Sequence, residues 1–497
     1  MLALTILLAT STHAGTLQND WGVPGDGDWE DNCNGAFSAF GSNHSDTPEL
    51  GSCDPTQSDC LHKASVQTAA FPHAVCADGS PAAFFYRPGE GADTHRWVIR
   101  LQGGIRPDSD EELMERWCGL DAQQSASTLT STSLPNVASS GGIHGGDVDN
   151  PFSDWNQVLA YSCSPDRWLG RSTGRSPDYT PSGVVPDVTV HERGHFVLRA
   201  FRKMLRQDGG RAWVPSAFAS MVTCGPEDEN TTSSPCIADL DDAEEILFAG
   251  SSSGGFGAMH SADWFLQRFV DDGAKVGLLV DGAAGGSHQA LDDVGWTLDG
   301  GSLYDSPTVQ AKLADQVTMQ DVNAFIDADC DFIAECTDSD DLLLPWQEGP
   351  LPRPSRVSTP TFIRYDLEDS ILEVTLAWAE DEGAMIDDGG TLRAPTCDDI
   401  SAVARQSLLL AHVDGHLPSQ VGSVTGVFGP AEGEHVGVDA DDVFFDHETG
   451  HVPAAEGDGL ATTVDAVWDW FDSGSAGFVP SKRVDAGVWS DATCLLP

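Results

Sequence analysis

Residues 244 to 260 read "EEILFAGSSSGGFGAMH", an apolar run followed by small residues and then by apolar residues at helical spacing. Within it Gly250, Ser252 and Gly254 satisfy the pattern G-x-S-x-G, which requires a sharp turn from a strand into a helix. Such a turn exposes the hydroxyl of its central residue, and only small neighbours leave room for it. The pattern therefore predicts that Ser252 is a nucleophile.

A flexible linker or a phosphate-binding loop would also be rich in small residues, as "GSSSGG" (250 to 255) is. A linker is not bracketed by an apolar strand and a helix, and a phosphate-binding loop needs a lysine where this chain has Phe256. These differences favour the nucleophile. The backbone N–H of Ser253, at the start of the following helix, would then donate to the oxyanion formed during acyl transfer.

Strands and helices are predicted to alternate on both sides of this turn. Helical periodicity is clear in "GHFVLRAFRKMLRQDGG" (194 to 210) and predicts further helices at about 255 to 270 and 462 to 472. Short apolar runs predict strands at 82–87, 95–104, 156–163, 244–250, 274–282, 359–366 and 406–413. The fold class predicted is α/β, a doubly wound, mostly parallel sheet with helices on both faces and long loop insertions.

Composition divides the chain of 497 residues into three parts. Residues 1–14, an uncharged apolar run followed by small residues, are predicted to be a secretory signal peptide. Residues 15–75 are rich in Gly, Asp, Asn and Ser, which predicts an irregular segment pinned by disulfides. Residues 76–497 are predicted to form a single catalytic domain with insertions at about 105–150 and 284–350, and the polar stretch 121–149 is expected to be a surface loop.

The cysteines support export. Twelve of them, an even number, favour an oxidising compartment, so that the protein is predicted to be secreted or periplasmic. Local pairs that would close short loops are Cys53 with Cys60, Cys224 with Cys236, and Cys330 with Cys336. No paired C-x-x-C pattern occurs, which makes a structural zinc site the weaker interpretation.

The charge balance restricts the partners. With 78 acidic and 25 basic residues the formal net charge is -53, so phosphate backbones and anionic membranes are disfavoured. No segment after the N-terminus approaches the roughly 18 apolar residues that span a bilayer. The sequence therefore predicts no nucleic-acid partner and no stable membrane insertion.

A serine nucleophile needs a base and a carboxylate that orients the base, and in doubly wound hydrolases these follow the serine in the order acid, then histidine. The predicted strand 359–366 ends in "DLEDS", which offers Asp366, Glu368 and Asp369.

The predicted strand 406–413 leads into "HVDGH", which offers two histidines. His412 lies inside the apolar run, where a structural role is expected. His416 follows Gly415, in the loop position that a base must occupy, and is therefore favoured. His435, His447 and His451 lie in a later acidic loop and could instead be solvated or linked to a metal.

Two glycines end the predicted strand 95–104. In "RLQGGI" (100 to 105) they would let backbone N–H groups approach an oxyanion without interference from a side chain. Gly104 and Ile105 are the candidate donors, although a plain turn would also explain the glycines.

At these residues the chain resembles the pectin acetylesterase and Notum family of secreted serine carboxylesterases. The resemblance rests on segments that occur in family order, over roughly residues 80 to 475. They are "LQGG" (101–104), "NPFSDWNQVLAYSCSPDRWLG" (150–170), "RGH" (193–195), "GSSSGG", "LLVDGAAGG" (278–286), "YDLEDS" and "LLLAHVDGH". The family's "WC" falls only at Trp117 and Cys118, after a stretch that is similar to an insertion.

The resemblance implies an α/β-hydrolase-like fold and no metal or organic cofactor. It also implies a triad of Ser252, Asp369 and His416, and it makes Asp166 and Trp168 candidate substrate contacts in a pocket-forming segment. The alternative for these last two is an ordinary role in a turn and in packing.

The predicted function is hydrolysis of an acyl ester, most simply an acetyl ester of a glycan or small molecule, through an acyl-enzyme. The family also includes hydrolases of longer acyl chains on protein. Because acetylated pectin is itself polyanionic, the charge of the chain favours a neutral acetylated glycan or a small ester. The alternative from another class is a non-catalytic, acidic exported binding protein that holds calcium in 327–341 or 439–448, although neither stretch has the spacing of an EF-hand loop.

Overall fold

The structure is a computed structural model of the 497-residue chain. The residues that it describes are 51–53, 60–104, 107, 110, 113–114, 129–132, 134–139, 141–146, 149–172, 174–177, 189–206, 213–221, 236–283, 291, 293–298, 301–303, 307, 357–366, 383–415, 424–429, 438, 462–472 and 481–484.

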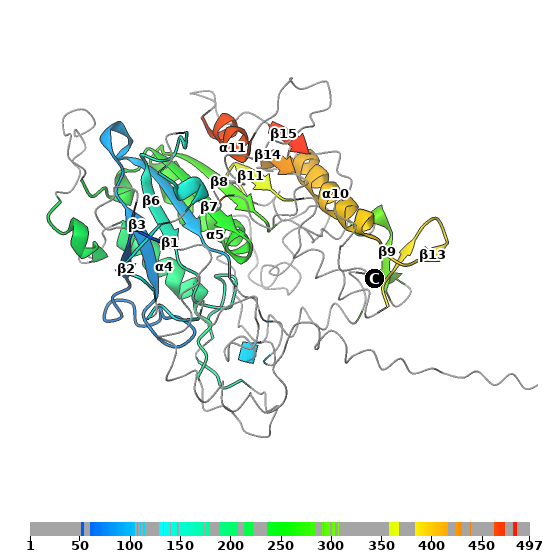
Figure 1. The fold of residues 1–497 in the computed structure, drawn as a ribbon, viewed down its shortest axis with the longest axis horizontal. Coiled ribbons are helices and arrows are strands. Elements are labelled where there is room, and N and C mark those ends of the chain that lie inside the picture. The colour runs from blue at the N-terminus through cyan, green and yellow to red at the C-terminus, as the bar shows by residue number, and fades with distance from the viewer. Residues whose placement is uncertain are drawn as a thin grey trace, which may run out of the picture.

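A single large sheet of eleven strands dominates the described part of the chain (Figure 1). Its first five strands pair antiparallel, and from β6 to β15 every neighbouring pair is parallel. In spatial order the strands are β1 (Gly51–Ser52), β5 (Val137–Ser139), β2 (Leu61–Ser65), β3 (Ala83–Arg87), β6 (Asn156–Ala160), β4 (Arg96–Leu101), β7 (Glu245–Ser251), β8 (Lys275–Asp281), β11 (Thr361–Arg364), β14 (Val424–Gly429) and β15 (Ser481–Val484).

Helices cover both faces of this sheet. The helices α4 (Gly194–Leu205), α5 (Ser253–Asp271) and α10 (Cys397–Gly415) contribute to one buried cluster with one face of the strands. The helix α11 (Thr463–Phe471), which begins with a capping box at Thr462, packs in a second cluster on the opposite face. The predicted fold class, a mostly parallel sheet between helices, is confirmed.

Smaller elements complete the described part. A four-stranded sheet is built from β10 (Gly301–Ser302), β9 (Trp296–Leu298), β12 (Met385–Asp387) and β13 (Leu392–Arg393). Short 3-10 helices are η1 (Gly91–Asp93), η3 (Gly142–His144), η5 (Ser216–Phe218) and η7 (Leu240–Asp242). Among the described helices, none combines the length and the apolar character that crossing a membrane requires.

The prediction of a strand at 406–413 is wrong, because this segment is the second half of α10. A short continuous apolar run does not distinguish a strand from a buried helix, and the helix begins well before it, with Ile400, Val403 and Ala404 buried at helical spacing. The strand that follows β11 in the sheet is β14, which the sequence analysis did not predict.

Two predicted irregular regions contribute strands to the main sheet. Part of 15–75 forms β2, which pairs with β3, and part of the loop predicted at 121–149 forms β5, which pairs with β2. The sheet therefore begins earlier in the chain than residue 76. Both strands are short and contain polar residues, so an apolar-run criterion does not detect them.

Disulfides tie the N-terminal part to the sheet. The pair Cys53–Cys60 is confirmed, and Cys76–Cys163 joins the segment before β3 to the end of β6. Cys236 and Cys397 are also disulfide-bonded. The other predicted partners Cys224, Cys330 and Cys336, the signal peptide at 1–14, the acidic stretches 327–341 and 439–448, and most of the insertion at 284–350 lie outside the described residues.

Candidate active site

The turn between β7 and α5 holds Ser252 in a strained conformation. Its φ is 51° and its ψ is -124°, a backbone conformation that residues other than glycine rarely adopt. The backbone N–H of Ser252 donates to the carbonyl of Asp281 at 2.7 Å, and its carbonyl accepts from the N–H groups of Gly255 and Phe256. The turn is thus fixed on both sides of the serine.

Glycine is required on both sides of Ser252 because backbone passes close to each position. A Cβ added at Gly250 would lie 2.2 Å from the carbonyl oxygen of Gly254. A Cβ added at Gly254 would lie 2.1 Å from the carbonyl oxygen of Leu101, at the end of β4. The pattern G-x-S-x-G therefore brings the first turn of α5 against the neighbouring strand.

The three consecutive serines have different partners. Ser251 is buried and its Oγ accepts a hydrogen bond from Arg100 Nη1 at 3.1 Å. Ser253 is also buried, and its Oγ donates to the carbonyl of Gly104 at 2.8 Å. Ser252 is half-buried, and its hydroxyl has no hydrogen bond to the described residues. Only Ser252 therefore combines partial exposure with an uncommitted hydroxyl.

Backbone donors gather around this serine. Ser253 is the first residue of α5, where backbone N–H groups have no partner within the helix. The Ser253–Gly104 hydrogen bond brings the end of the β4 loop to the same place. Gly103 is closer still, since a Cβ there would lie 3.0 Å from Ser252 Cβ. Of the predicted donors, Gly104 and Ser253 meet here and Ile105 lies outside the described residues, whereas Gly103 was not predicted.

The segment that follows β6 forms a wall beside the first turn of α5. Trp168 donates from Nε1 to the carbonyl of Gln102 at 3.1 Å and packs on Gly257, where no Cβ could fit. Arg167 lies over the ring of Phe256, 4.6 Å from its centroid. Both Arg167 and Trp168 have positive φ, as Ser252 does. Backbone strain therefore occurs on both sides of the site.

Asp166 organises this wall from inside it. The carboxylate is fully buried and accepts from Ser164 Oγ at 2.7 Å, from Trp168 N at 3.0 Å and from Gly194 N at 2.7 Å. Burial raises the pKa of Asp166, and these hydrogen bonds oppose the shift. These contacts fit the alternative role for Asp166, which is to hold a turn. Trp168 is only 3% exposed, which likewise fits the alternative role in packing.

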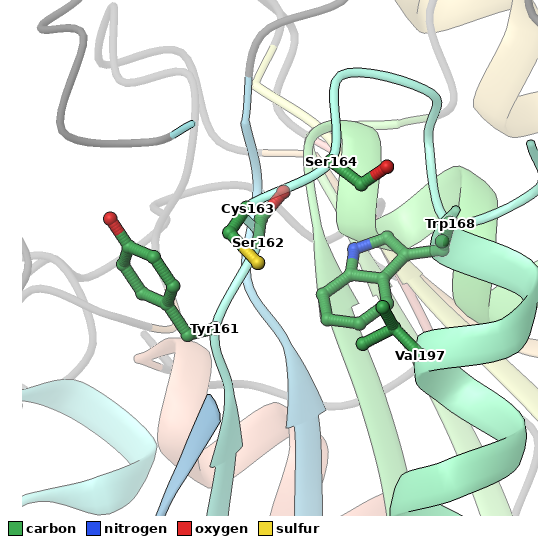
Figure 2. Close-up of a pocket in the computed structure, with 7 residues that line it drawn as sticks. Tyr161, Ser162, Cys163, Ser164, Trp168 and Val197 are labelled. Carbon is green, nitrogen blue, oxygen red and sulfur yellow. The ribbon is translucent and has the colours of Figure 1, made fainter. Parts of the chain in front are cut away.

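A small crevice lies at this wall. Figure 2 shows Trp168 and Val197 facing Ser162 and Cys163 across it. The crevice is too small to hold an organic ligand of the size that binding pockets usually accept.

The carboxyl ends of β8 and β11 hold a buried group of charges beside the nucleophile turn. Arg364 Nη1 contacts Asp281 Oδ1 at 3.1 Å, and Arg364 Nη2 contacts Asp366 Oδ2 at 3.5 Å, with all three side chains fully buried. Asp366, the alternative to Asp369, is therefore engaged by an arginine. Asp369 lies outside the described residues, three positions beyond it.

The positions of α10 and β14 bear on which histidine could act as the base. His416 directly follows α10, which ends at Gly415, and belongs to the connection that enters β14 at its amino end. Ser252 follows the carboxyl end of β7, and the strands from β7 to β14 are parallel. The amino end of β14 is thus at the opposite edge of the sheet from Ser252. His416 lies outside the described residues, as does the side chain of His412 within α10.

The chain leaves β14 at Gly429 on the same edge as the nucleophile, and it is described again at Val438. Val438 N donates to Asp281 Oδ2 at 3.0 Å, while the carbonyl of Asp281 accepts from Ser252 N. One residue therefore links Val438 to the nucleophile turn. His435 lies three positions before Val438, a span of at most about 11 Å of chain. From the sequence alone His435 is expected in an acidic loop with no catalytic role, because the apolar-run criterion does not detect β14.

Comparisons with known proteins find similar sequences and a similar fold. Residues 56–206 match the family model described as Pectinacetylesterase. Two relatives from Xenopus laevis, the palmitoleoyl-protein carboxylesterases notum1' and notum1, are each 24% identical over 227 residues, which is 45% of this chain and 35% of the relative. The matched part therefore spans about a third of the length of these relatives.

The fold also matches a solved structure. The Wnt deacylase Notum from Drosophila superposes with a TM-score of 0.50 at 19% identity, covering 86% of this chain and 97% of that one. At this identity the match concerns the fold alone, which is α/β-hydrolase-like.

Proposed function

We propose that the protein is an exported serine carboxylesterase acting on acyl esters. The proposal is supported by the similarity of the chain to the pectin acetylesterase and Notum family in sequence and in fold. One observation supports it above the others. Ser252 is held at φ 51° between β7 and α5, half-buried, with the first turn of α5 and the loop after β4 beside it. Strain of this kind persists where the surrounding structure imposes it, as at catalytic turns.

Within this proposal the acid is Asp369, five positions along the chain from Arg364, where β11 ends at the same edge of the sheet as β7 and Ser252. For the base, the sequence predicts His416, but the strand that supported it is helix α10. The direction of β14 and the hydrogen bond from Val438 to Asp281 favour His435. We therefore take His435 as the base and keep His416 as the competing assignment.

The reaction runs in two steps. The histidine takes the proton of Ser252 as Oγ attacks the ester carbonyl carbon, and the tetrahedral anion is stabilised by the N–H of Ser253 and by those of the glycines after β4. Collapse breaks the bond to the alkoxy oxygen, which leaves as an alcohol with the proton from the imidazolium. Water then attacks the acyl-serine by the same route, which releases the carboxylic acid and restores Ser252.

The net charge of the chain favours one class of substrate. A chain with a net charge of -53 repels polyanionic esters at low salt, which favours a neutral acetylated glycan or a small acetyl ester. The names of the Xenopus relatives state that those proteins act on a palmitoleoyl group of a protein. A longer acyl chain is therefore the alternative substrate for this chain.

The decisive experiment compares serine variants in the full chain. Ser252→Ala should abolish hydrolysis of p-nitrophenyl acetate and covalent labelling by a fluorophosphonate, with unchanged thermal unfolding. The matched control is Ser261→Ala in the same helix, because that buried hydroxyl donates to the carbonyl of Gly257 and is remote from the turn. Turnover retained in Ser252→Ala would refute the proposal. Rates for acetyl against octanoyl esters then distinguish the two acyl classes.

The base is assigned by a second pair of variants. His435→Ala should lower kcat by at least about 10³-fold, because a serine without its general base is a poor nucleophile, whereas His416→Ala should leave kcat within about twofold. The reverse result would return the base to His416 and would show that the connection before β14 reaches the carboxyl edge of the sheet.

A further inference from the structure

On the sheet face that packs against α11, four adjacent strands change from apolar to polar toward their carboxyl ends. Val98, Leu247, Leu279 and Phe362, on β4, β7, β8 and β11, belong to the buried apolar cluster of that face. Two or four residues further along the same strands, pointing to the same face, the side chains are Arg100, Ser251, Asp281 and Arg364, and all four are buried.

These polar residues are aligned by the register of the strands. Ser251 pairs with Asp281, and Asp281 pairs with Arg364. Arg100, on the other side of β7, donates to Ser251 Oγ. A continuous buried polar row therefore crosses the sheet immediately below the nucleophile turn, and Asp366 extends it beyond β11. We call these five residues the polar row.

Asp281 is the member of the polar row that contacts the most catalytic segments. Its carbonyl accepts from Ser252 N at 2.7 Å, its Oδ1 contacts Arg364 at 3.1 Å, and its Oδ2 accepts from Val438 N at 3.0 Å. One residue thus joins the nucleophile turn, the strand that precedes the acid, and the segment that follows β14.

A role in stability alone does not account for this arrangement. The row holds two arginines and two aspartates, so its formal charges cancel. Desolvation of buried charges offsets most of their mutual attraction, and a well-packed apolar set is often as stable. What the carboxylate adds is geometry, since it fixes two backbone segments and one arginine at once.

We infer, on the basis of the proposed function, that Asp281 is a positioning residue for ester hydrolysis, which sets the mutual placement of the nucleophile turn and the loop that carries the base. A displacement of about 1 Å at a catalytic group can lower the rate by 10²-fold. Asp281→Asn keeps the backbone carbonyl and one side-chain acceptor oxygen. Its amide N–H₂ group, however, must face either Arg364 or the N–H of Val438, and both of these are donors. The two segments must then shift apart.

The test needs a matched control for the loss of a buried, hydrogen-bonded carboxylate. Asp263 in α5 is 4% exposed and accepts from Ser358 N at 2.7 Å and from Thr359 N at 2.9 Å, before the amino end of β11 and remote from Ser252. Asp263→Asn therefore makes the same chemical change at a comparably buried site. Both variants should have lower melting temperatures than the parent protein.

Only Asp281→Asn should change catalysis. We expect kcat for p-nitrophenyl acetate to fall by about 10- to 100-fold with KM within about twofold, and labelling of Ser252 by a fluorophosphonate to slow by a similar factor. Arg364→Lys, which keeps the charge but not the planar geometry, should show a smaller loss in the same direction. If Asp281→Asn does not fold, the Arg364→Lys result decides.

The outcomes separate the two claims. Labelling of Asp281→Asn at the rate of the parent protein and of Asp263→Asn, together with unchanged kcat in both Asp281→Asn and Arg364→Lys, would overturn the positioning role and leave the esterase proposal standing. Absence of labelling and turnover in the parent protein itself would refute the esterase, and the positioning role with it.

Discussion

The two faces of the central strands are built for different purposes. On β4, β7 and β8, the face toward α4 and α5 is apolar from the first side chain to the last. It begins with Trp97, Ile246 and Val276 and stays apolar to the carboxyl ends of these strands, where Ser252 lies. The face toward α11 begins apolar but ends in the polar row of Arg100, Ser251, Asp281, Arg364 and Asp366. The named side chains of both faces are buried, so the faces differ in chemistry and not in burial.

One sheet can in this way support both a stable core and a strained turn. Apolar contacts are non-directional and tolerate small shifts, whereas hydrogen bonds and ion pairs fix angles and distances. The apolar face should therefore dominate the free energy of unfolding, and the polar row should dominate the geometry at Ser252. Substitutions on each face can break or sharpen that division.

The largest expected effect on stability is on the apolar face. Phe248 on β7 stacks on Phe265 of α5 with ring centroids 4.7 Å apart. Phe248→Ala should lower the free energy of unfolding by about 3 to 5 kcal/mol, since it leaves a cavity in a packed core. Denaturant unfolding measures this loss. The kcat of the folded enzyme should stay within about twofold, and a fall comparable to that of Asp281→Asn would break the division between the faces.

A smaller effect is expected in the polar row, where two adjacent serines give opposite results. Ser251→Ala removes one hydrogen-bond acceptor of the buried Arg100 and should cost about 1 to 3 kcal/mol of stability, with a partial loss of activity. Ser252→Ala should leave stability unchanged while abolishing activity. Thermal melting and esterase rates on the two variants distinguish them, and equal melting temperatures would contradict the role given to the Arg100–Ser251 contact.

Much of the fold was predictable because its elements have strong local signals. The nucleophile turn, α4, α5 and the strands β3, β4, β6, β7, β8 and β11 all follow from periodicity and from glycine positions. The error at 406–413 arose where no periodicity distinguishes a helix from a strand, and it removed β14 from the predicted sheet. Because of that error His416 was expected to follow a strand, whereas it follows helix α10.

The site was predictable only in part, for a physical reason. Ser252 is marked by its own neighbours in sequence, because a tight turn constrains adjacent residues. Asp281 carries no such mark, since "LLVDG" reads as an ordinary strand end, and its partners Arg364 and Val438 are 83 and 157 residues away. Contacts that depend on strand register become visible only when the sheet is assembled. Asp369 and the histidine assignments stay predictions.

The smallest effect is a pH dependence at the margin of the α11 face. His144, from η3, is fully buried and its Nδ1 hydrogen-bonds Gln157 Oε1 at 2.7 Å. Burial, together with the nearby charges of Arg100 and Arg87, holds the pKa of His144 well below its ordinary value of 6.5. Below about pH 6.5 the unfolded chain therefore binds a proton that the folded chain does not, and stability falls as the pH falls.

For one such group the slope is at most about 1.4 kcal/mol per pH unit, and it vanishes above the unfolded pKa. His144→Gln keeps a polar side chain that can hydrogen-bond Gln157 but cannot titrate. The difference in unfolding free energy between the variant and the parent protein should thus change between pH 7.5 and 5.5 in favour of the variant. A flat difference over that range would contradict the lowered pKa of His144, because burial and the charges of Arg100 and Arg87 would then not oppose its protonation in the folded protein.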